Sequence, residues 1–135
     1  GLSDKVVFTG YVPHDEVPRI LATCDIALCL FTKEGGRHSF GFSPLKLFEY
    51  MAMGLPVIST DVEWVREIIE EGRGGFLIPI ENMRNPMSIS EAFIPLLANS
   101  SLRESVGRAA RRICETKYSW DTITTKIVCL YQNTN

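Results

Sequence analysis

The sequence predicts an α/β protein, a parallel sheet of about four strands with helices on its faces. Short apolar runs alternate with helical patterns along the chain, which is typical of parallel α/β units. One run, residues 26–31, is almost continuously apolar, as expected of a strand buried on both faces. The composition, 45% hydrophobic and 22% charged, is ordinary for a globular domain. We therefore expect residues 1–135 to form one domain.

Four segments have the length and composition of strands. Each is a short apolar run, and glycine or proline lies at the end of several of them. The expected strands are residues 6–9, 26–31, 56–59 and 75–79. A polar, glycine-bearing loop is expected from Thr32 to Phe42.

Helical patterns fill the segments between these strands and the end of the chain. Ser43 can cap the helix that includes residues 43–54, Pro44 fits its first position, and Gly54 fits its C-terminal end. The other expected helices are residues 15–24, residues 63–70 ended by Gly72, and three further helices up to about Tyr131.

The last three helices have recognisable boundaries in the sequence. Ser88 with Glu91, and Ser101 with Glu104, have the spacing of capping boxes at helix starts. Pro95 should kink or shorten the first of these helices.

Charge and cysteine content exclude several classes of protein. The formal net charge of −2 gives no global reason to expect a nucleic-acid partner. No apolar run approaches the roughly 20 residues of a membrane-spanning helix. The cysteines lack metal-ligand spacing and lie among apolar residues, so we expect reduced, buried thiols in a cytoplasmic protein and no metal site. The four cysteines are Cys24, Cys29, Cys114 and Cys129.

The segment GFSPLKLFEYMAMGLPVIS, residues 41–59, carries the chemistry that the sequence suggests. In an open parallel sheet, ligands bind beyond the carboxyl ends of the strands, and a helix N-terminus there suits a diphosphate. The backbone N–H groups of Leu45 and Lys46, and the Lys46 charge, would face that ligand. Glu49 lies one turn deeper, where a carboxylate could accept hydrogen bonds from the hydroxyls of a ribose.

A purely structural interpretation of the same residues stays open. Lys46 and Glu49 have the spacing of an ordinary exposed ion pair. The surrounding aromatic and methionine residues are typical of a core rather than of cofactor contacts: Phe48, Tyr50, Met51 and Met53. Packing is likewise the expected role of Trp64 and Trp120.

The run SPLKLFEYMAMGLPVIST resembles the donor-site helix and following strand of group 1 glycosyltransferases. Three further pieces follow the order of that family: KVVFTGYVPHDEVPRILATCDIALCLF, VREIIEEGRGGFLIP and LRESVGRAARRICETKYSW. The resemblance implies the Rossmann-like C-terminal domain of a GT-B enzyme. Such an enzyme transfers a hexose from a nucleotide-diphosphate sugar, with retention of configuration, to a carbohydrate or lipid-linked acceptor. It implies no cofactor and no bound metal.

The resemblance also implies roles for residues of the donor site. Glu49 occupies the late glutamate of the family's E-x7-E pattern, which binds the nucleotide ribose, whereas Gly41 stands at the early glutamate, so the sugar contact departs from the family. Ser43 and Leu45 would lie against the diphosphate and nucleotide. The remaining donor-binding residues would be Phe42, Pro44 and Lys46, and Glu34, His38 and Ser39 would lie on the loop that faces the donor. No residue receives a catalytic role.

The resemblance implies that parts of the enzyme precede this chain. The family's domain begins with two more strand–helix units, and an acceptor-binding domain lies before them. In the family's strand order, 3-2-1-4-5-6, the two missing strands would lie between residues 6–9 and 26–31. The first strand would close that gap, another chain would fill it, or the piece would be marginally stable. We expect self-association, because unpaired strand edges pair between chains.

Other hypotheses stay open at this point. The chain could be a non-catalytic nucleotide-binding or interaction module, or a nucleotide-sugar epimerase, which shares the GT-B layout. Basic residues of the late helices could contact an anionic membrane surface or could simply be solvated. These residues are Arg103, Arg108, Arg111, Arg112 and Lys117.

Overall fold

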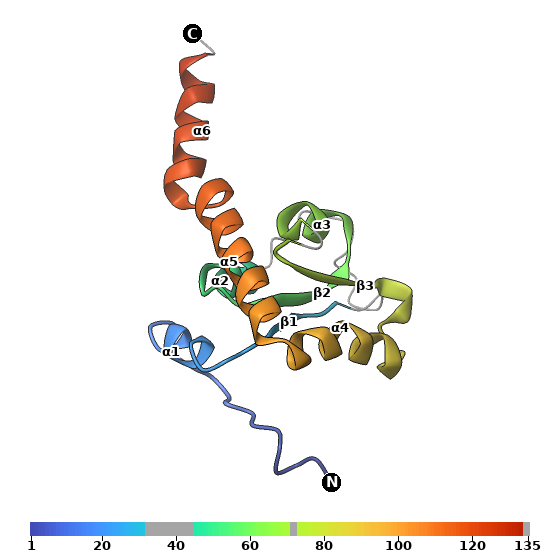
Figure 1. Ribbon diagram of the computed structural model, residues 1–135. Coiled ribbons are helices and arrows are strands. Elements are labelled where there is room, and N and C mark those ends of the chain that lie inside the picture. Colours follow the sequence, from blue (N-terminus) through green and yellow to red (C-terminus); the bar gives the residue numbers. More distant parts are fainter. Residues whose placement is uncertain (32–44, 71–72, 134–135) are drawn as a thin grey trace.

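The computed structural model describes residues 1–31, 45–70 and 73–133, which form a parallel sheet and its helices (Figure 1). The sheet has three strands in the order β1-β2-β3. Val57 on the central strand is in register with Ala27 on one side and Gly75 on the other. The strands are β1 (Ala27–Cys29), β2 (Val57–Asp61) and β3 (Gly75–Pro79).

Helices connect and follow the strands, so the predicted fold class is confirmed. A short helix, α1, precedes the sheet, and α2 and α3 alternate with its strands. Three consecutive helices, α4 to α6, end the chain. The bounds are α1 (Val17–Leu21), α2 (Leu45–Ala52), α3 (Glu63–Ile69), the 3-10 helix η2 (Ile80–Asn82), α4 (Pro86–Ala98), α5 (Ser100–Lys117) and α6 (Trp120–Gln132).

The two faces of the sheet have separate apolar cores. On one face, Val57 packs with buried side chains of α2, α3 and α5, among them Leu47, Ile69 and Ile113. On the other face, Ile58 packs with Ile78 and with Leu96 of α4. Figure 1 shows α5 beside α2 at one end of the strands, and α4 running along the strands near β3.

Two glycines allow α2 and α5 to approach closely. Gly54, just after α2, has a left-handed φ of 72°, as expected for the residue that ends a helix. Its carbonyl oxygen lies 2.0 Å from the position that a Cβ on Gly107 of α5 would occupy. Any side chain at Gly107 would therefore collide with the backbone that ends α2. This contact fixes the end of α2 against α5.

The first predicted strand, residues 6–9, is not a strand. These residues have no regular secondary structure, and the side chain of Phe8 is 93% exposed. Figure 1 shows the N-terminal segment leading away from the sheet, so it does not close up beside β1. A single extended segment cannot form backbone hydrogen bonds without a neighbouring strand. The edge of β1 that faces away from β2 has no strand partner among the described residues, and self-association stays a prediction.

Helix ends differ from several predictions. The Asn85 and Asn99 side chains accept hydrogen bonds from the N–H groups of Met87 and Leu102. These residues, rather than Ser88 and Ser101, cap α4 and α5, because asparagine is an equally good cap and lies nearer the start. The Ser119 side chain accepts a hydrogen bond from Thr122 N–H at the start of α6.

Two further helix predictions need correction. Helix α3 ends before Glu70, which has a left-handed φ of 50°, and Gly72 lies outside the described residues. Helix α4 continues through Pro95 to Ala98, so Pro95 does not shorten it.

Exposure also departs from two expectations. Cys29 and Cys114 are buried free thiols, as predicted, but Cys24 and Cys129 are exposed. On β1, Leu28 is 40% exposed, so this strand is not buried on both faces. The reason is that α4 packs against β2 and β3 and leaves the outer part of β1 uncovered.

Candidate functional site

The first turn of α2 lies at the carboxyl end of β1. Phe31 follows the end of that strand, and the Lys46 ammonium nitrogen lies 5.4 Å from the centroid of the Phe31 ring. The Lys46 charge also acts on Cys29, the last residue of β1. Burial raises the pKa of the Cys29 thiol, and the nearby Lys46 charge and the Ser59 hydroxyl oppose that rise only in part. The sheet thus presents α2 at the edge where parallel α/β proteins bind ligands.

Three of the predicted donor-binding residues lie in the first two turns of α2. Leu45 and Lys46 are exposed, and Glu49 is half-buried on the next turn. The other four, Gly41, Phe42, Ser43 and Pro44, lie outside the described residues, as do Glu34, His38 and Ser39.

Lys46 and Glu49 do not form the ordinary ion pair that their spacing allows. Within the described ranges, the salt bridges join other residues, and the Lys46 ammonium contacts the Phe31 ring instead. The Glu49 carboxylate has no hydrogen bond or ion pair in that part of the chain, although its charge acts on the neighbouring Tyr50. Neither of these two charged groups therefore neutralises the other.

The opposite side of α2 packs into the core. Leu47 and Met51 are fully buried, and the predicted packing of Phe48, Tyr50 and Met53 against the core is confirmed. Burial raises the pKa of Tyr50, and the nearby Cys29 and Glu49 charges raise it further. The helix is thus held by one side and presents Lys46 from the other.

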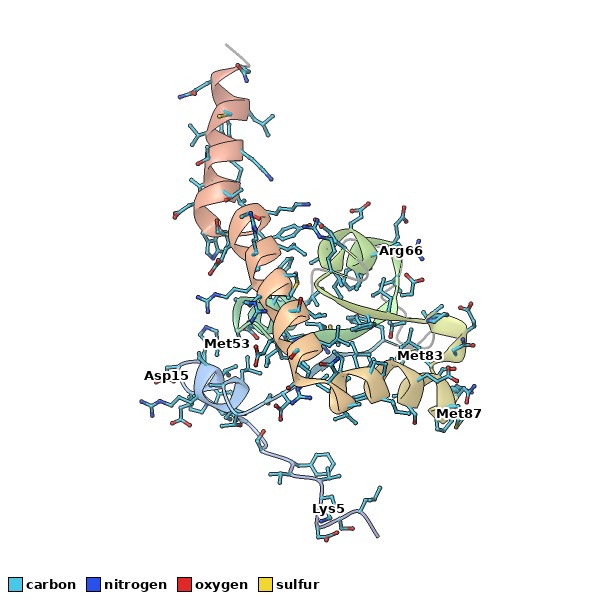
Figure 2. All side chains as sticks on the ribbon, in the orientation of Figure 1. Lys5, Asp15, Met53, Arg66, Met83 and Met87 are labelled. Atoms are coloured by element: carbon cyan, nitrogen blue, oxygen red, sulfur yellow. The ribbon has the colours of Figure 1, made fainter. Side chains whose placement is uncertain are left out.

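Thr60, at the carboxyl end of β2, joins the site through Phe31, and sequence analysis did not identify it. The Phe31 N–H donates to Thr60 Oγ1 at 2.8 Å, and Oγ1 lies 3.0 Å from the Phe31 carbonyl oxygen, to which it donates. Met83 Sδ lies 3.3 Å from Thr60 Oγ1 (Met83 is labelled in Figure 2). The Thr60 hydroxyl has a single hydrogen. It donates this hydrogen to the Phe31 carbonyl oxygen, because a carbonyl oxygen is a stronger acceptor than the Met83 sulfur. In the sequence, the feature that could have indicated Thr60 was the position of a threonine at the end of a buried strand.

Trp64, in the first turn of α3, packs against Phe31, the residue that also contacts Lys46 and Thr60. Its ring meets the Phe31 ring edge-on, with centroids 5.3 Å apart. Beside it, Arg66 donates to both carboxylate oxygens of Asp61, at 3.0 and 2.6 Å (Arg66 is labelled on α3 in Figure 2). The packing role predicted for Trp64 is confirmed, but Trp120 is 83% exposed and does not pack.

Other features of the described residues lie away from this edge. Two hollows of about 590 and 500 Å³ lie along α6 and between α5 and the residues after α3, and among the described residues neither is lined by Leu45, Lys46 or Glu49. The described residues hold no group of three or more His, Cys, Asp or Glu that could bind a metal. None of the described helices is both long and apolar enough to cross a membrane.

Comparison with known proteins identifies the family of this chain. The family described as "Glycosyl transferases group 1" matches residues 1–99. The spore coat protein SA of Bacillus subtilis is 30% identical over 96% of this chain and 32% of its own length. The N-acetyl-alpha-D-glucosaminyl L-malate synthase of Bacillus anthracis is 31% identical over 96% of this chain and 31% of its own length.

A solved structure supports the fold. Sucrose-phosphate synthase from Thermosynechococcus elongatus matches 98% of this chain with a TM-score of 0.78 and 22% identity, over 31% of its own length. The chain therefore spans about a third of the proteins it matches. The order of strands and helices and the match over residues 1–99 lead to one conclusion: the chain belongs to the group 1 glycosyltransferase family.

Proposed function

We propose that this chain is the donor-binding part of a longer, retaining glycosyltransferase, one that transfers a hexose from a nucleotide-diphosphate sugar to a carbohydrate or lipid-linked acceptor. The observation that carries the proposal is the position of α2. Its first turn lies at the carboxyl end of β1, with the exposed Lys46 cation and, on the next turn, the Glu49 carboxylate, which has no ion pair among the described residues. Residues 1–135 would form a single partial domain of that enzyme.

The chemistry of this turn suits a nucleoside diphosphate. Unpaired N–H groups at a helix start and the charge of Lys46 attract a diphosphate, whose negative charge grows as the bond to the sugar breaks. The Glu49 carboxylate would accept hydrogen bonds from the ribose hydroxyls. Gly41, Phe42, Ser43, Pro44 and Leu45 complete the donor-binding segment in this proposal. The N-acetyl-alpha-D-glucosaminyl L-malate synthase supports a sugar-transfer role, since its name describes the joining of a sugar to an acceptor.

Nucleotide affinity tests the proposal. The protein to use is the full polypeptide encoded by the reading frame that contains this chain, titrated calorimetrically with UDP, GDP and ADP. For the nucleotide that binds, Glu49→Ala should raise the Kd by about 10- to 100-fold, because hydrogen bonds to a charged group contribute about 1.5–3 kcal/mol.

Glu91→Ala is the matched control. Glu91 is an exposed helical glutamate on α4, far along the chain from this site, and its removal should leave the Kd unchanged. An unchanged Kd for Glu49→Ala would remove the ribose role. Failure of the full polypeptide to bind any of the three nucleotides would favour a non-catalytic interaction module instead.

We also propose that the enzyme acts in the cytoplasm and approaches lipid-linked acceptors at the membrane surface through α5. Arg108, Arg111 and Arg112 are exposed on this helix. Cosedimentation should be stronger with phosphatidylserine vesicles than with neutral vesicles, and Arg112→Gln should weaken it. Equal binding to both kinds of vesicle would count against this placement.

A further inference from the structure

We propose that Thr60 is a positioning residue of the nucleotide site, which holds the Lys46 ammonium in place through Phe31. The inference rests on the proposed function, since it concerns the same site. Thr60 does not contact the ligand in this proposal. It acts through two contacts that the described residues make, one between backbone and hydroxyl and one between ring and cation.

The first contact fixes the backbone of Phe31. Strand β1 ends at Cys29, so Phe31 lies beyond the last backbone pairing with β2. The Thr60 hydroxyl takes the place of that pairing, since it accepts from Phe31 N–H at 2.8 Å and donates to the Phe31 carbonyl at 3.0 Å. Thr60 is fully buried, so water cannot replace these hydrogen bonds. This hydroxyl therefore fixes the backbone direction of Phe31 beyond the strand pairing.

The second contact carries that direction to Lys46. The Phe31 ring contacts two partners, the Trp64 ring at 5.3 Å and the Lys46 ammonium at 5.4 Å. A cation is attracted to the face of an aromatic ring at this distance. Lys46 has no ion pair among the described residues that would otherwise restrict its long side chain. The orientation of the Phe31 ring thus restricts where the charge of Lys46 lies.

Ser59 provides a matched comparison on the same strand. It is also fully buried, and its hydroxyl donates to the Cys29 carbonyl oxygen at 2.6 Å. Both hydroxyls therefore join β2 to β1, but the Ser59 hydroxyl bonds to Cys29 inside the strand pairing, whereas the Thr60 hydroxyl bonds to Phe31 beyond it. A general loss of sheet stability should follow from a change at either residue. A loss of nucleotide affinity should follow only from a change at Thr60.

The experiment measures nucleotide Kd in the full polypeptide and unfolding by urea for each variant. Thr60→Val keeps the shape and removes the hydroxyl, and it should raise the Kd by about threefold to fivefold, as expected for loss of an exposed cation–π contact. Thr60→Ser should restore the affinity, and Ser59→Ala should lower stability without changing the Kd. Phe31→Leu keeps the Thr60 hydrogen bonds and removes the ring. It should weaken binding as Thr60→Val does, and it serves if Thr60→Val does not fold.

A double variant tests the path itself. If Thr60 acts through Lys46, Thr60→Val should have no further effect on Kd once Lys46→Ala is present. Additive effects, or equal losses for Ser59→Ala and Thr60→Val, would overturn the positioning role and leave the proposed function intact. If neither Lys46→Ala nor Glu49→Ala changes the Kd, the proposed function and this inference both fail.

Discussion

The middle of this chain and its two ends differ in burial although both contain apolar residues. In the middle, Val57 and Ile58 on β2 and Leu47 on α2 are fully buried. At the ends, residues 6–9 and helix α6 contribute no buried residue. Figure 1 shows both ends leading away from the sheet in different directions. The comparison teaches that apolar side chains organise this molecule only where a second element covers them.

The largest expected difference between these regions is in core substitutions. Ile69→Ala removes a fully buried side chain of α3 and should lower the free energy of unfolding by about 2–5 kcal/mol. Phe8→Ala removes a larger side chain that is 93% exposed and should change the stability by less than about 0.5 kcal/mol. Urea denaturation of the 135-residue chain measures both. Surface substitutions usually change the free energy of unfolding by less than about 0.5 kcal/mol. A loss of more than about 1 kcal/mol for Phe8→Ala would therefore show that residues 6–9 are packed in solution.

Glycine substitutions sharpen the comparison at the level of the backbone. Gly107→Ala should lower the free energy of unfolding by about 1–3 kcal/mol, because the new Cβ would meet the Gly54 carbonyl and separate α2 from α5. Gly10→Ala is the control at the unpacked end, where no atom lies within 4 Å of the new Cβ. Its positive φ can relax there, so the effect should be smaller. Equal effects at the two sites would contradict a tight α2–α5 contact.

The smallest expected effect on stability concerns a pair of salt bridges within the packed region. The Glu70 carboxylate pairs with Lys117 of α5 and with Arg73. The hydrogen bond from Lys117 is the main reason that the pKa of Glu70 lies below its ordinary value, and the charges of Lys117 and Arg73 lower it further. A carboxyl with a lowered folded-state pKa adds stability above its unfolded pKa and loses it as the pH falls through the folded value.

Glu70→Gln should therefore lower stability at neutral pH but not in acid. The difference from the original protein should begin to shrink below about pH 4.3, the ordinary value for glutamate, and should vanish below the lowered pKa. Urea denaturation at several pH values measures it, with Glu91→Gln as the control, since Glu91 is exposed and forms no salt bridge with another described residue. A difference that does not change with pH would assign the effect to packing rather than to charge.

Local sequence patterns were sufficient for the elements of the packed middle. The apolar runs at β2 and β3 and the period of α2 predict strands and a helix close to those observed. The same helical period places Leu47 and Met51 on the buried side of α2 and leaves Lys46 exposed. Sequence alone could therefore nominate Lys46 and Glu49, because residues of one helix keep their relative positions wherever the helix packs.

Contacts between elements could not be predicted in the same way. Thr60 and Phe31 are 29 positions apart, and their hydrogen bonds exist only because β1 and β2 pair in one register. The strand predicted at residues 6–9 has a suitable apolar pattern, but the described part of the chain offers no neighbouring strand to accept its backbone hydrogen bonds. Periodicity and capping depend on residues within one or two helical turns. Strand pairing, the exposure of Leu28 and the contact between Lys46 and Phe31 depend on which surfaces meet, and that is settled only when the chain packs.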